Sequence, residues 1–191
     1  MRQGRVPQGP VRGRGRDLGV SVRPRVAADL EGCARVLAAV HRQDGYPVNW
    51  PAEPAGWLSP STLLAAWVAE LDGAVAGHVV LSRSGPDDLA PALWAAEAGA
   101  EAGQAAVVNR LFVAPAARGH RIGARLMAEA TRAAHDLGLH PVLDVVATDT
   151  AAAALYERLG WRLLATTEQR WSPEQTVSVR SYAAPAVPPP D

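Results

Sequence analysis

A buried-strand pattern at residues 105–113 leads, through a loop with two glycines, directly into an amphipathic helix pattern at residues 122–137. Apolar side chains recur at positions 122, 126, 127, 130, 133, 134 and 137, which is the spacing of one helix face. Gly138 follows at the place of a C-terminal helix cap. A strand that feeds a one-sided helix in this way indicates a sheet covered by helices.

Strand and helix patterns also alternate along the rest of residues 19–184. Two apolar runs, 64–71 and 74–82, are joined by Asp72-Gly73, a strong hairpin signal. Residues 41–57 read as a polar, aromatic loop. Further strands are expected at residues 20–23, 141–147, 161–167 and 177–182, and further helices at 27–40, 89–97 and 150–159. The fold class expected is mixed α/β (α+β).

Composition limits the classes of protein open to this chain of 191 residues. Nineteen acidic residues balance nineteen basic ones, all of which are arginine, so a uniformly basic nucleic-acid-binding surface is excluded. The single Cys33 excludes an internal disulfide and a Cys-rich zinc site, and the five histidines show no metal-ligand spacing. No apolar run is long enough for a membrane span, and the basic N-terminus lacks the apolar stretch of a secretory signal. A cytoplasmic location is therefore expected.

Three segments are expected along the chain. Residues 1–18 form an Arg/Gly-rich arm with too few apolar side chains to fold, residues 19–184 form one domain, and residues 185–191 form a Pro-rich tail. A role of the arm in binding nucleic acid is an open alternative. It would give salt-sensitive retention of DNA or RNA that is lost when the arm is removed.

The loop before the central helix has the properties of a phosphate site. Residues 113–124 read VAPAARGHRIGA, so a strand ends, Pro115 stops the pairing, and a helix begins within a few residues. The first turn of a helix has unpaired N–H groups and a partial positive charge, and glycines allow a ligand to approach them. The spacing is neither that of a P-loop nor G-x-G-x-x-G.

Three linked motifs resemble the GCN5-related N-acetyltransferase (GNAT) superfamily, in which acetyl-CoA donates its acetyl group to an amine. RLFVAP at residues 110–115 is similar to the family's central strand, and RGHRIGA at 118–124 to its pyrophosphate loop. Asp149 followed by LYERLGW at 155–161 is similar to its closing element. The resemblance implies a mostly antiparallel sheet of six to seven strands, flanked by about four helices and splayed between the fourth and fifth strands.

The resemblance also implies roles for individual residues. The backbone of Leu111, Phe112 and Val113 would pair with the pantetheine arm of acetyl-CoA, and Tyr156 would hydrogen-bond the thioester sulfur as the acetyl group leaves. Other residues expected at the cofactor are Arg118, Gly119, His120, Arg121, Ile122, Gly123, Ala124 and Asp149.

Two residues depart from the family pattern. Arg121 replaces the first glycine of the loop, which is tolerable if that position has helical φ. Asp149 stands where an asparagine is usual, and an ionised carboxylate accepts hydrogen bonds but cannot donate them. Asp149 is therefore expected to cap the next helix.

Direct attack of a neutral amine on the thioester is the mechanism that the resemblance implies. Cys33 lies at a core-facing position and shows no sign of activation as a nucleophile. The central strand carries Val107 and Asn109 where many family members have a glutamate base. Asp144, Glu70 and Asp44 are the alternative candidate bases, with Asp144 the catalytic candidate named beside Tyr156.

The 41–57 loop is expected to bind the acceptor, a small-molecule or peptide amine. Asp44, Tyr46 and Trp50 are the candidate contacts, with Trp57 and His41 nearby, whereas His78 is expected to be a core residue. A non-catalytic acyl-CoA-binding module is the second alternative, because the glutamate is missing. A homodimer is possible in this fold, and no metal is expected.

Overall fold

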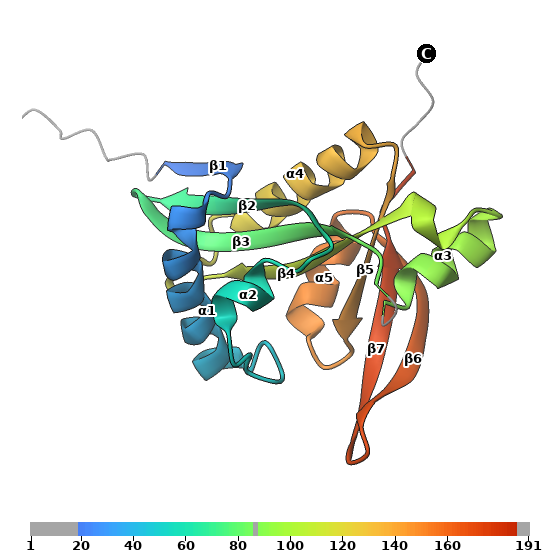
Figure 1. Cartoon of the computed structure of the whole chain (residues 1–191). Helices are drawn as coiled ribbons and strands as arrows, with labels where there is room; N and C mark the ends of the chain where they lie inside the picture. Colours follow the sequence, from blue (N-terminus) through green and yellow to red (C-terminus); the bar gives the residue numbers. More distant parts are fainter. Residues whose placement is uncertain (1–18, 86–87, 187–191) are drawn as a thin grey trace, which may run out of the picture.

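The computed structural model describes residues 19–85 and 88–186, and in them one seven-stranded sheet is covered by helices on both faces (Figure 1). The strands are β1 Val20–Pro24, β2 Leu63–Leu71, β3 Ala74–Arg83, β4 Ala105–Val113, β5 His140–Val146, β6 Arg162–Ser172 and β7 Gln175–Ala183. The helices are α1 Leu30–Asp44, α2 Pro54–Leu58, α3 Ala90–Ala98, α4 Ile122–Asp136 and α5 Thr150–Arg158. Short 3₁₀ turns lie at Ala27–Asp29, Ala102–Gln104 and Pro115–Ala117.

The sheet has the order β1-β2-β3-β4-β5-β7-β6, and all its neighbours are antiparallel except β4 and β5. The predicted mixed α/β class, with a mostly antiparallel sheet, is therefore confirmed. The predicted hairpin is also present, because Asp72 and Gly73 both have positive φ angles, 53° and 80°, as a tight hairpin turn requires.

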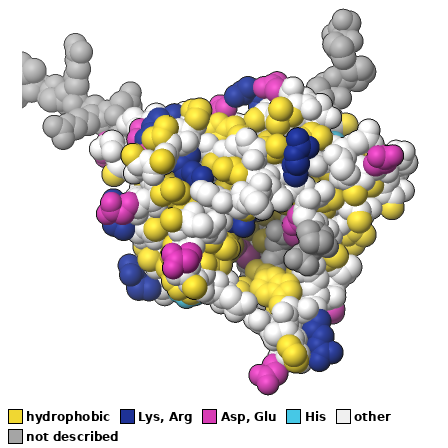
Figure 2. Space-filling model, in the orientation of Figure 1, with side chains coloured by type: hydrophobic (Ala, Val, Ile, Leu, Met, Phe, Trp, Pro, Cys, Tyr) yellow, Lys and Arg dark blue, Asp and Glu magenta, His cyan; other side chains and the backbone are white. Residues whose placement is uncertain are grey.

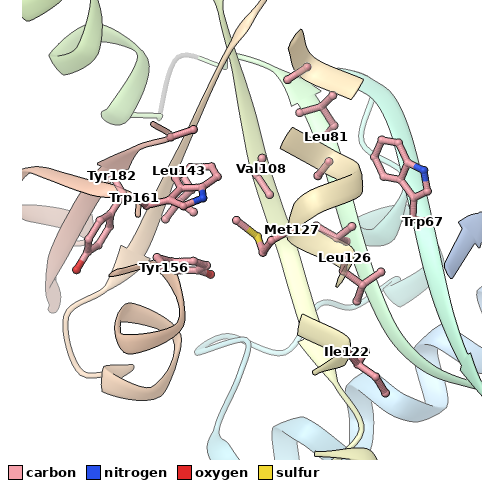
Figure 3. Close-up of a cluster of buried hydrophobic side chains, with 14 of the residues drawn as sticks. Trp67, Leu81, Val108, Ile122, Leu126, Met127, Leu143, Tyr156, Trp161 and Tyr182 are labelled. Carbon is pink, nitrogen blue, oxygen red and sulfur yellow. The ribbon is translucent and has the colours of Figure 1, made fainter. Parts of the chain in front are cut away.

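Each face of the sheet has its own hydrophobic core. Side chains of α4 and α5 pack on one face against β2, β3 and β4, as the cluster around Leu126, Met127 and Tyr156 illustrates (Figure 3). On the other face, α1 and α2 pack around Leu37 and Phe112, and α3 packs separately on β4, β5 and β7. The central strands are therefore buried on both sides.

Strands β4 and β5 separate after a short paired segment. They pair only from Ala105 to Val107, opposite His140 to Val142, and beyond that point β4 has no partner on its β5 side. The predicted splay between the fourth and fifth strands is therefore present. It leaves an unpaired stretch of β4 facing the gap between the two strands.

A β-bulge changes the face of the sheet on which side chains in the second half of β4 lie. Strict alternation would place Val108 and Arg110 on one face, but Val108 and Leu111 both pack into the α4 core. The register with β3 shifts at this point, and Arg110 has a φ of 51°. Within this bulge, the carbonyl of Arg110 contacts Nδ1 of His78 at 3.1 Å.

His78 is a buried core residue, as predicted. Its side chain is 0% exposed and stacks on Phe112, with ring centroids 5.1 Å apart. Nη1 of Arg25 lies 2.9 Å from Nε2, so Nε2 accepts that bond and Nδ1–H donates to the Arg110 carbonyl. Burial lowers the pKa of His78 to about 3, which keeps the ring neutral.

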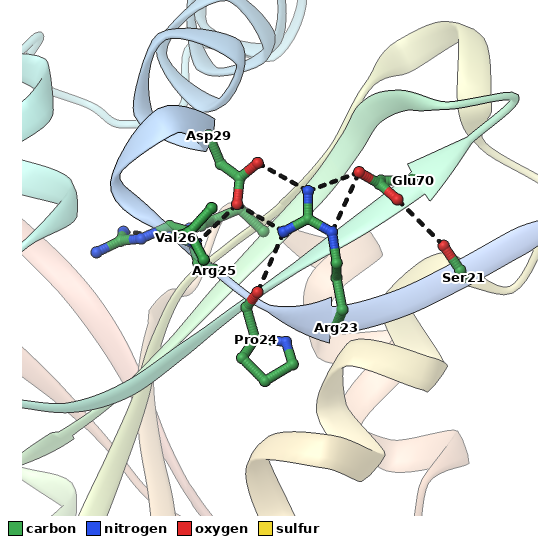
Figure 4. A network of polar contacts seen from close by, with 8 residues as sticks. Ser21, Arg23, Pro24, Arg25, Val26, Asp29 and Glu70 are labelled. Carbon is green, nitrogen blue, oxygen red and sulfur yellow. Dashed lines mark hydrogen bonds and ion pairs between the residues drawn. The ribbon is translucent and has the colours of Figure 1, made fainter.

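Glu70 lies in a polar network that ties β1, β2 and the start of α1 together (Figure 4). The guanidinium of Arg23 binds Asp29 at 2.7 and 2.8 Å and Glu70 at 2.6 Å. Arg23 holds the pKa of the Asp29 carboxyl below its usual value. Because Glu70 is occupied here and lines neither cavity described below, its place in the fold argues against the role of a base.

Some boundaries differ from the prediction. Helix α1 runs to Asp44, α2 forms inside the expected 41–57 loop, and β6 extends to Ser172. The predicted arm and residues 187–191 of the predicted tail lie outside the described residues. Within the described residues, no helix is both long and apolar enough to span a membrane.

Candidate active site

Two adjacent cavities lie where β4 and β5 separate. The loop cavity, of about 520 Å³, is bounded by the end of α1, β4, the segment before α4 and the start of α5. The hairpin cavity, of about 440 Å³, is bounded by β4, β5 and the β6–β7 hairpin. Both volumes are typical of small-molecule sites. The residues that line both cavities are Tyr46, Val48, Leu111, Val146, Asp149 and Ala152.

The opening is visible on the surface. Figure 2 shows this face of the molecule hollowed between the region of α1 and α2 and the β6–β7 hairpin, with hydrophobic side chains at the edge. The six residues common to both linings show that the two cavities are adjacent.

The segment before α4 presents a row of free backbone donors. Within the described part of the chain, the six N–H groups from Gly119 to Ala124 form no hydrogen bond, and the first bonded one is Arg125 N, to Arg121 O at 3.1 Å. An ordinary helix start leaves four such groups. Their alignment with the α4 dipole makes an anion site suited to phosphate.

Backbone conformation at Arg121 differs from the expectation. Its φ is 58°, in the left-handed region, so the condition that this position has helical φ is not met. The residue precedes the first turn of α4 and is exposed. Gly119 also has a positive φ, 87°, so the chain turns sharply between the 3₁₀ turn and α4.

The side chains of this segment play secondary parts. The His120 ring turns back on its own loop, with Nδ1 3.2 Å from Ala117 O. Arg118 lines the loop cavity and pairs with Asp44 at the end of α1. Asp44 therefore lies on the loop-cavity side and is occupied by Arg118, which argues against its predicted acceptor contact and its candidacy as a base.

The start of α4 packs closely against α5 and lies next to the end of β4. A Cβ added at Gly123 would lie 3.1 Å from Leu155 Cδ2 and 3.9 Å from Val113 Cγ2, so a larger residue would crowd this wall of the loop cavity. Leu111, Phe112 and Val113 line the same cavity with the unpaired side of β4. Their peptide groups are available to an extended ligand.

Tyr156 reaches the hairpin cavity from α5. Its side chain is only 7% exposed, and its ring packs against Trp161 and Tyr182 at centroid distances of 6.2 and 5.9 Å (Figure 3). Within the described residues its hydroxyl forms no hydrogen bond. Burial raises the pKa of Tyr156 above its usual value, so the phenol is protonated at neutral pH and can act as a donor.

Asp149 caps α5, as expected. One carboxylate oxygen accepts from Ala152 N at 2.9 Å, and the residue lines both cavities. Its charge is thus directed at the start of the helix.

Asp144 lines the hairpin cavity but is already used by the protein. It accepts from Leu89 N at 2.8 Å, from Ala90 N at 3.1 Å and from the Ser181 hydroxyl. These bonds join β5 to the start of α3 and to β7. Because both carboxylate oxygens are engaged by these three donors, this geometry argues against Asp144 as the base.

The predicted aromatic residues separate in the structure. Tyr46 lines both cavities and lies edge-on to Trp57, 6.2 Å between ring centroids. Trp50 lines neither cavity and packs on His41 at 5.1 Å. Of the aromatic residues predicted to lie at the acceptor, Tyr46 and Trp57 therefore line the hairpin cavity, whereas Trp50 does not.

Arg110 and Trp171 are among the cavity-lining residues that were not singled out from the sequence as acceptor contacts. Trp171 comes from the β6–β7 hairpin, which continues beyond the predicted strands. Arg110 was assigned to a motif but not to a site, because only the bulge in β4 brings its side chain over the Trp57 ring, 4.8 Å from Cζ to the centroid. No sequence signal marks either position.

The arrangement suits a thioester of coenzyme A. The free N–H row fits a pyrophosphate, the unpaired side of β4 fits an extended amide-containing arm, and the hairpin cavity continues beyond it. The chain matches the model of the Acetyltransferase (GNAT) family over residues 30–161, more than half of its length. The chain belongs to this family, and it is therefore an acyltransferase of a class that uses acetyl-CoA.

Solved acetyltransferase structures have the same fold. The ribosomal-protein-S18-alanine N-acetyltransferase of Escherichia coli is 15% identical, with a TM-score of 0.63, 87% of this chain covered and 94% of that one. A Salmonella typhimurium protein solved with its cofactor acetyl-CoA is 16% identical, with a TM-score of 0.64 and coverage of 91% and 98%.

A GCN5-related N-acetyltransferase from Kribbella flavida is 22% identical, with a TM-score of 0.64 and coverage of 87% and 98%. At these identities the likeness shows the fold alone. A comparison with curated proteins found no significant match.

Proposed function

We propose that this enzyme transfers the acetyl group of acetyl-CoA to the α-amino group of a small molecule or peptide. The observation that carries the proposal is the row of six free N–H groups, Gly119 to Ala124, next to the unpaired side of β4. Acetyl-CoA supplies an activated acyl group with a thiolate leaving group. The residues proposed to hold it are those predicted above at β4 and the α4 loop.

The hairpin cavity is the proposed acceptor side. An amine that enters there lies between Tyr46 and Tyr156 and next to Leu111 of β4. Tyr156 donates a hydrogen bond to the leaving sulfur, where negative charge develops, and this preference for the transition state lowers the barrier. Because its pKa is raised, Tyr156 acts by hydrogen bonding rather than as a phenolate.

The engagement of all three candidate bases within the described residues determines which amines are expected to react. Asp144, Glu70 and Asp44 are all engaged by other groups of the protein. The amine must therefore lose its proton largely in solution before it attacks. The α-amino group of a peptide or of an amino-acid amide has a pKa near ~8 and is several per cent neutral at pH 7, whereas a lysine side chain, near ~10.4, is well under one per cent neutral. We expect α-amines to be better substrates than lysine ε-amines.

Tyr156→Phe tests the role of the hydroxyl. We expect kcat to fall by about 10- to 1,000-fold, because one transition-state donor is lost. Stabilisation by acetyl-CoA in a thermal melt should be kept. The assay is release of free thiol from acetyl-CoA with a panel of α-amines.

Tyr182→Phe is the matched control, since Tyr182 is a buried tyrosine that lines neither cavity and bonds Glu157 at 3.0 Å. It should keep kcat. An unchanged kcat in Tyr156→Phe would refute the donor role. Stabilisation by acetyl-CoA without turnover of any amine would instead favour a non-catalytic acyl-CoA-binding module.

A further inference from the structure

Arg110 presents a cation in the hairpin cavity that forms no ion pair within the described residues, although the charge of Asp88 on the cavity wall acts on it. Among the described residues, no carboxylate forms an ion pair with its guanidinium, whose only hydrogen bond is from Nη1 to Asn109 Oδ1 at 3.0 Å. Its Nε is buried and has no acceptor. A buried N–H of a charged group without a partner is costly. Because Nε is itself closed to solvent, the donors left for a ligand are the terminal Nη1 and Nη2 groups.

The carboxylates around the same cavity are each engaged with backbone N–H groups. Asp144 binds the start of α3, Asp149 caps α5, and Asp88 accepts from Gly85 N at 2.6 Å. The acids thus stabilise the walls of the cavity, whereas the guanidinium contributes no comparable structural bond. Among the described residues that line this cavity, Arg110 is therefore the only cation and the only charged side chain without a hydrogen bond to the backbone.

The geometry holds Arg110 in place for a ligand. Its guanidinium lies over the Trp57 ring at 4.8 Å, a cation–π contact that fixes the plane of the fork. Its backbone is held in a left-handed conformation, with the carbonyl bound to buried His78. Strain of this kind, fixed by the surrounding core, is typical of functional positions.

We propose that Arg110 binds the carboxylate of the acceptor, so that the substrate is a free α-amino acid or a close analogue. The inference rests on the proposed function and names its substrate class. A planar guanidinium matches a carboxylate through two parallel N–H···O bonds. Arg110 directly precedes Leu111, which lines both cavities, so a carboxylate held there leaves room for an amine only one carbon away to face the thioester. The N-terminal residue of a peptide has no carboxylate at that position.

The test compares each L-amino acid with its own α-amide as acceptor, by kcat/KM from thiol release. The amide keeps the amine and side chain but removes the negative charge, and its amine is more readily neutral. We expect the wild-type enzyme to prefer the acid of its best pair by about 10- to 100-fold, as for a lost charged hydrogen-bond pair. Arg110→Gln should abolish that preference by lowering only the value for the acid, and Arg110→Lys should keep part of it.

Arg35→Gln is the matched control, because Arg35 is an exposed α1 residue paired only with Glu31. It should keep the preference, and both Arg110 variants should keep the thermal shift with acetyl-CoA, which shows that they fold. The assignment would be overturned if the amides have a kcat/KM equal to or above that of the acids in the wild type, or if Arg110→Gln keeps the preference for the acid. Either result would leave the proposed acetyl transfer intact. Loss of the proposed function itself has a different signature, which is no thiol release with any amine.

Discussion

Arg110 and Arg121, two non-glycine residues beside the cavities, have φ angles of 51° and 58°. For an L-residue this region costs about 1–2 kcal/mol. Both residues adjoin groups with a proposed ligand role, the open guanidinium and the row of N–H groups. At this scale the site is built from backbone conformation as much as from side chains.

Arg121→Gly should stabilise the protein. Glycine adopts a positive φ without strain, and the gain of roughly 1 kcal/mol corresponds to a rise in Tm of about 2–4 °C for a chain of this size. Stabilisation by acetyl-CoA should persist, because we expect the backbone and not the side chain to bind phosphate. Thermal melts with and without acetyl-CoA measure both effects.

Arg42→Gly provides the contrast, since Arg42 is an exposed residue within α1, where glycine is unfavourable. Its Tm should fall. If Arg121→Gly also lowers Tm, the left-handed conformation is not a source of strain. If it instead abolishes stabilisation by acetyl-CoA, the Arg121 side chain is a phosphate ligand.

At the scale of elements, α4 is seated against β3 at Gly77. A Cβ added there would lie 2.8 Å from Ile122 Cγ2, 3.0 Å from Leu126 Cδ1 and 3.2 Å from the Phe112 carbonyl oxygen. Ile122 is the first residue of α4, so this contact sets the distance between the helix start and the sheet. The position of the free N–H row depends on it.

Gly77→Ala should therefore destabilise the fold and weaken the cofactor site together. Overpacking of this size costs about 1–3 kcal/mol. We expect a lower Tm and a lower affinity for acetyl-CoA, measured by titration calorimetry. Gly103→Ala is the control, because a Cβ there meets no atom within 4 Å. Equal behaviour of the two variants would show that α4 is not held by this contact.

The elements that the sequence predicted well are those with a strong local pattern. The predicted bounds of β4 match the structure, and α4 begins at the predicted residue, because an apolar run and a periodic helix face meet at a proline- and glycine-containing loop. The Asp72-Gly73 hairpin was equally clear. Helix α2 was missed because it is a five-residue helix in a segment rich in proline.

Features fixed by tertiary contacts could not be predicted. The β4 bulge depends on the His78 bond to Arg110 O, a contact between residues 32 positions apart. The engagement of Asp144 by the start of α3 joins segments 54 and 55 positions apart. The loop before α4 was therefore accessible from the sequence, whereas the walls of the hairpin cavity and the contacts of the candidate bases were not.

At the scale of the whole molecule, buried His78 couples stability to pH. Its pKa is about 3 in the folded protein and 6.5 as the unperturbed value, so between these values the unfolded chain binds a proton that the folded chain does not. Stability is then fully present above pH 6.5 and decreases as the pH falls toward the folded value. From pH 7 to 5.5 we expect a loss of about 1 kcal/mol from this group.

Urea unfolding of wild type and His78→Gln at pH 7 and 5.5 measures this loss. The variant is expected to be less stable at both values, since it disturbs the bonds to Arg25 and Arg110, but the difference between the two pH values should shrink by about 1 kcal/mol. The same pH difference in both proteins would contradict a neutral, buried His78.

The central claim is that the α4 loop and the unpaired side of β4 bind acetyl-CoA. A thermal melt of the protein with and without acetyl-CoA tests it most directly. At a hundredfold excess over Kd, binding should stabilise the fold by about 2.7 kcal/mol. That corresponds to a rise in Tm of roughly 5–10 °C for this size of chain. No shift at millimolar acetyl-CoA would contradict the claim.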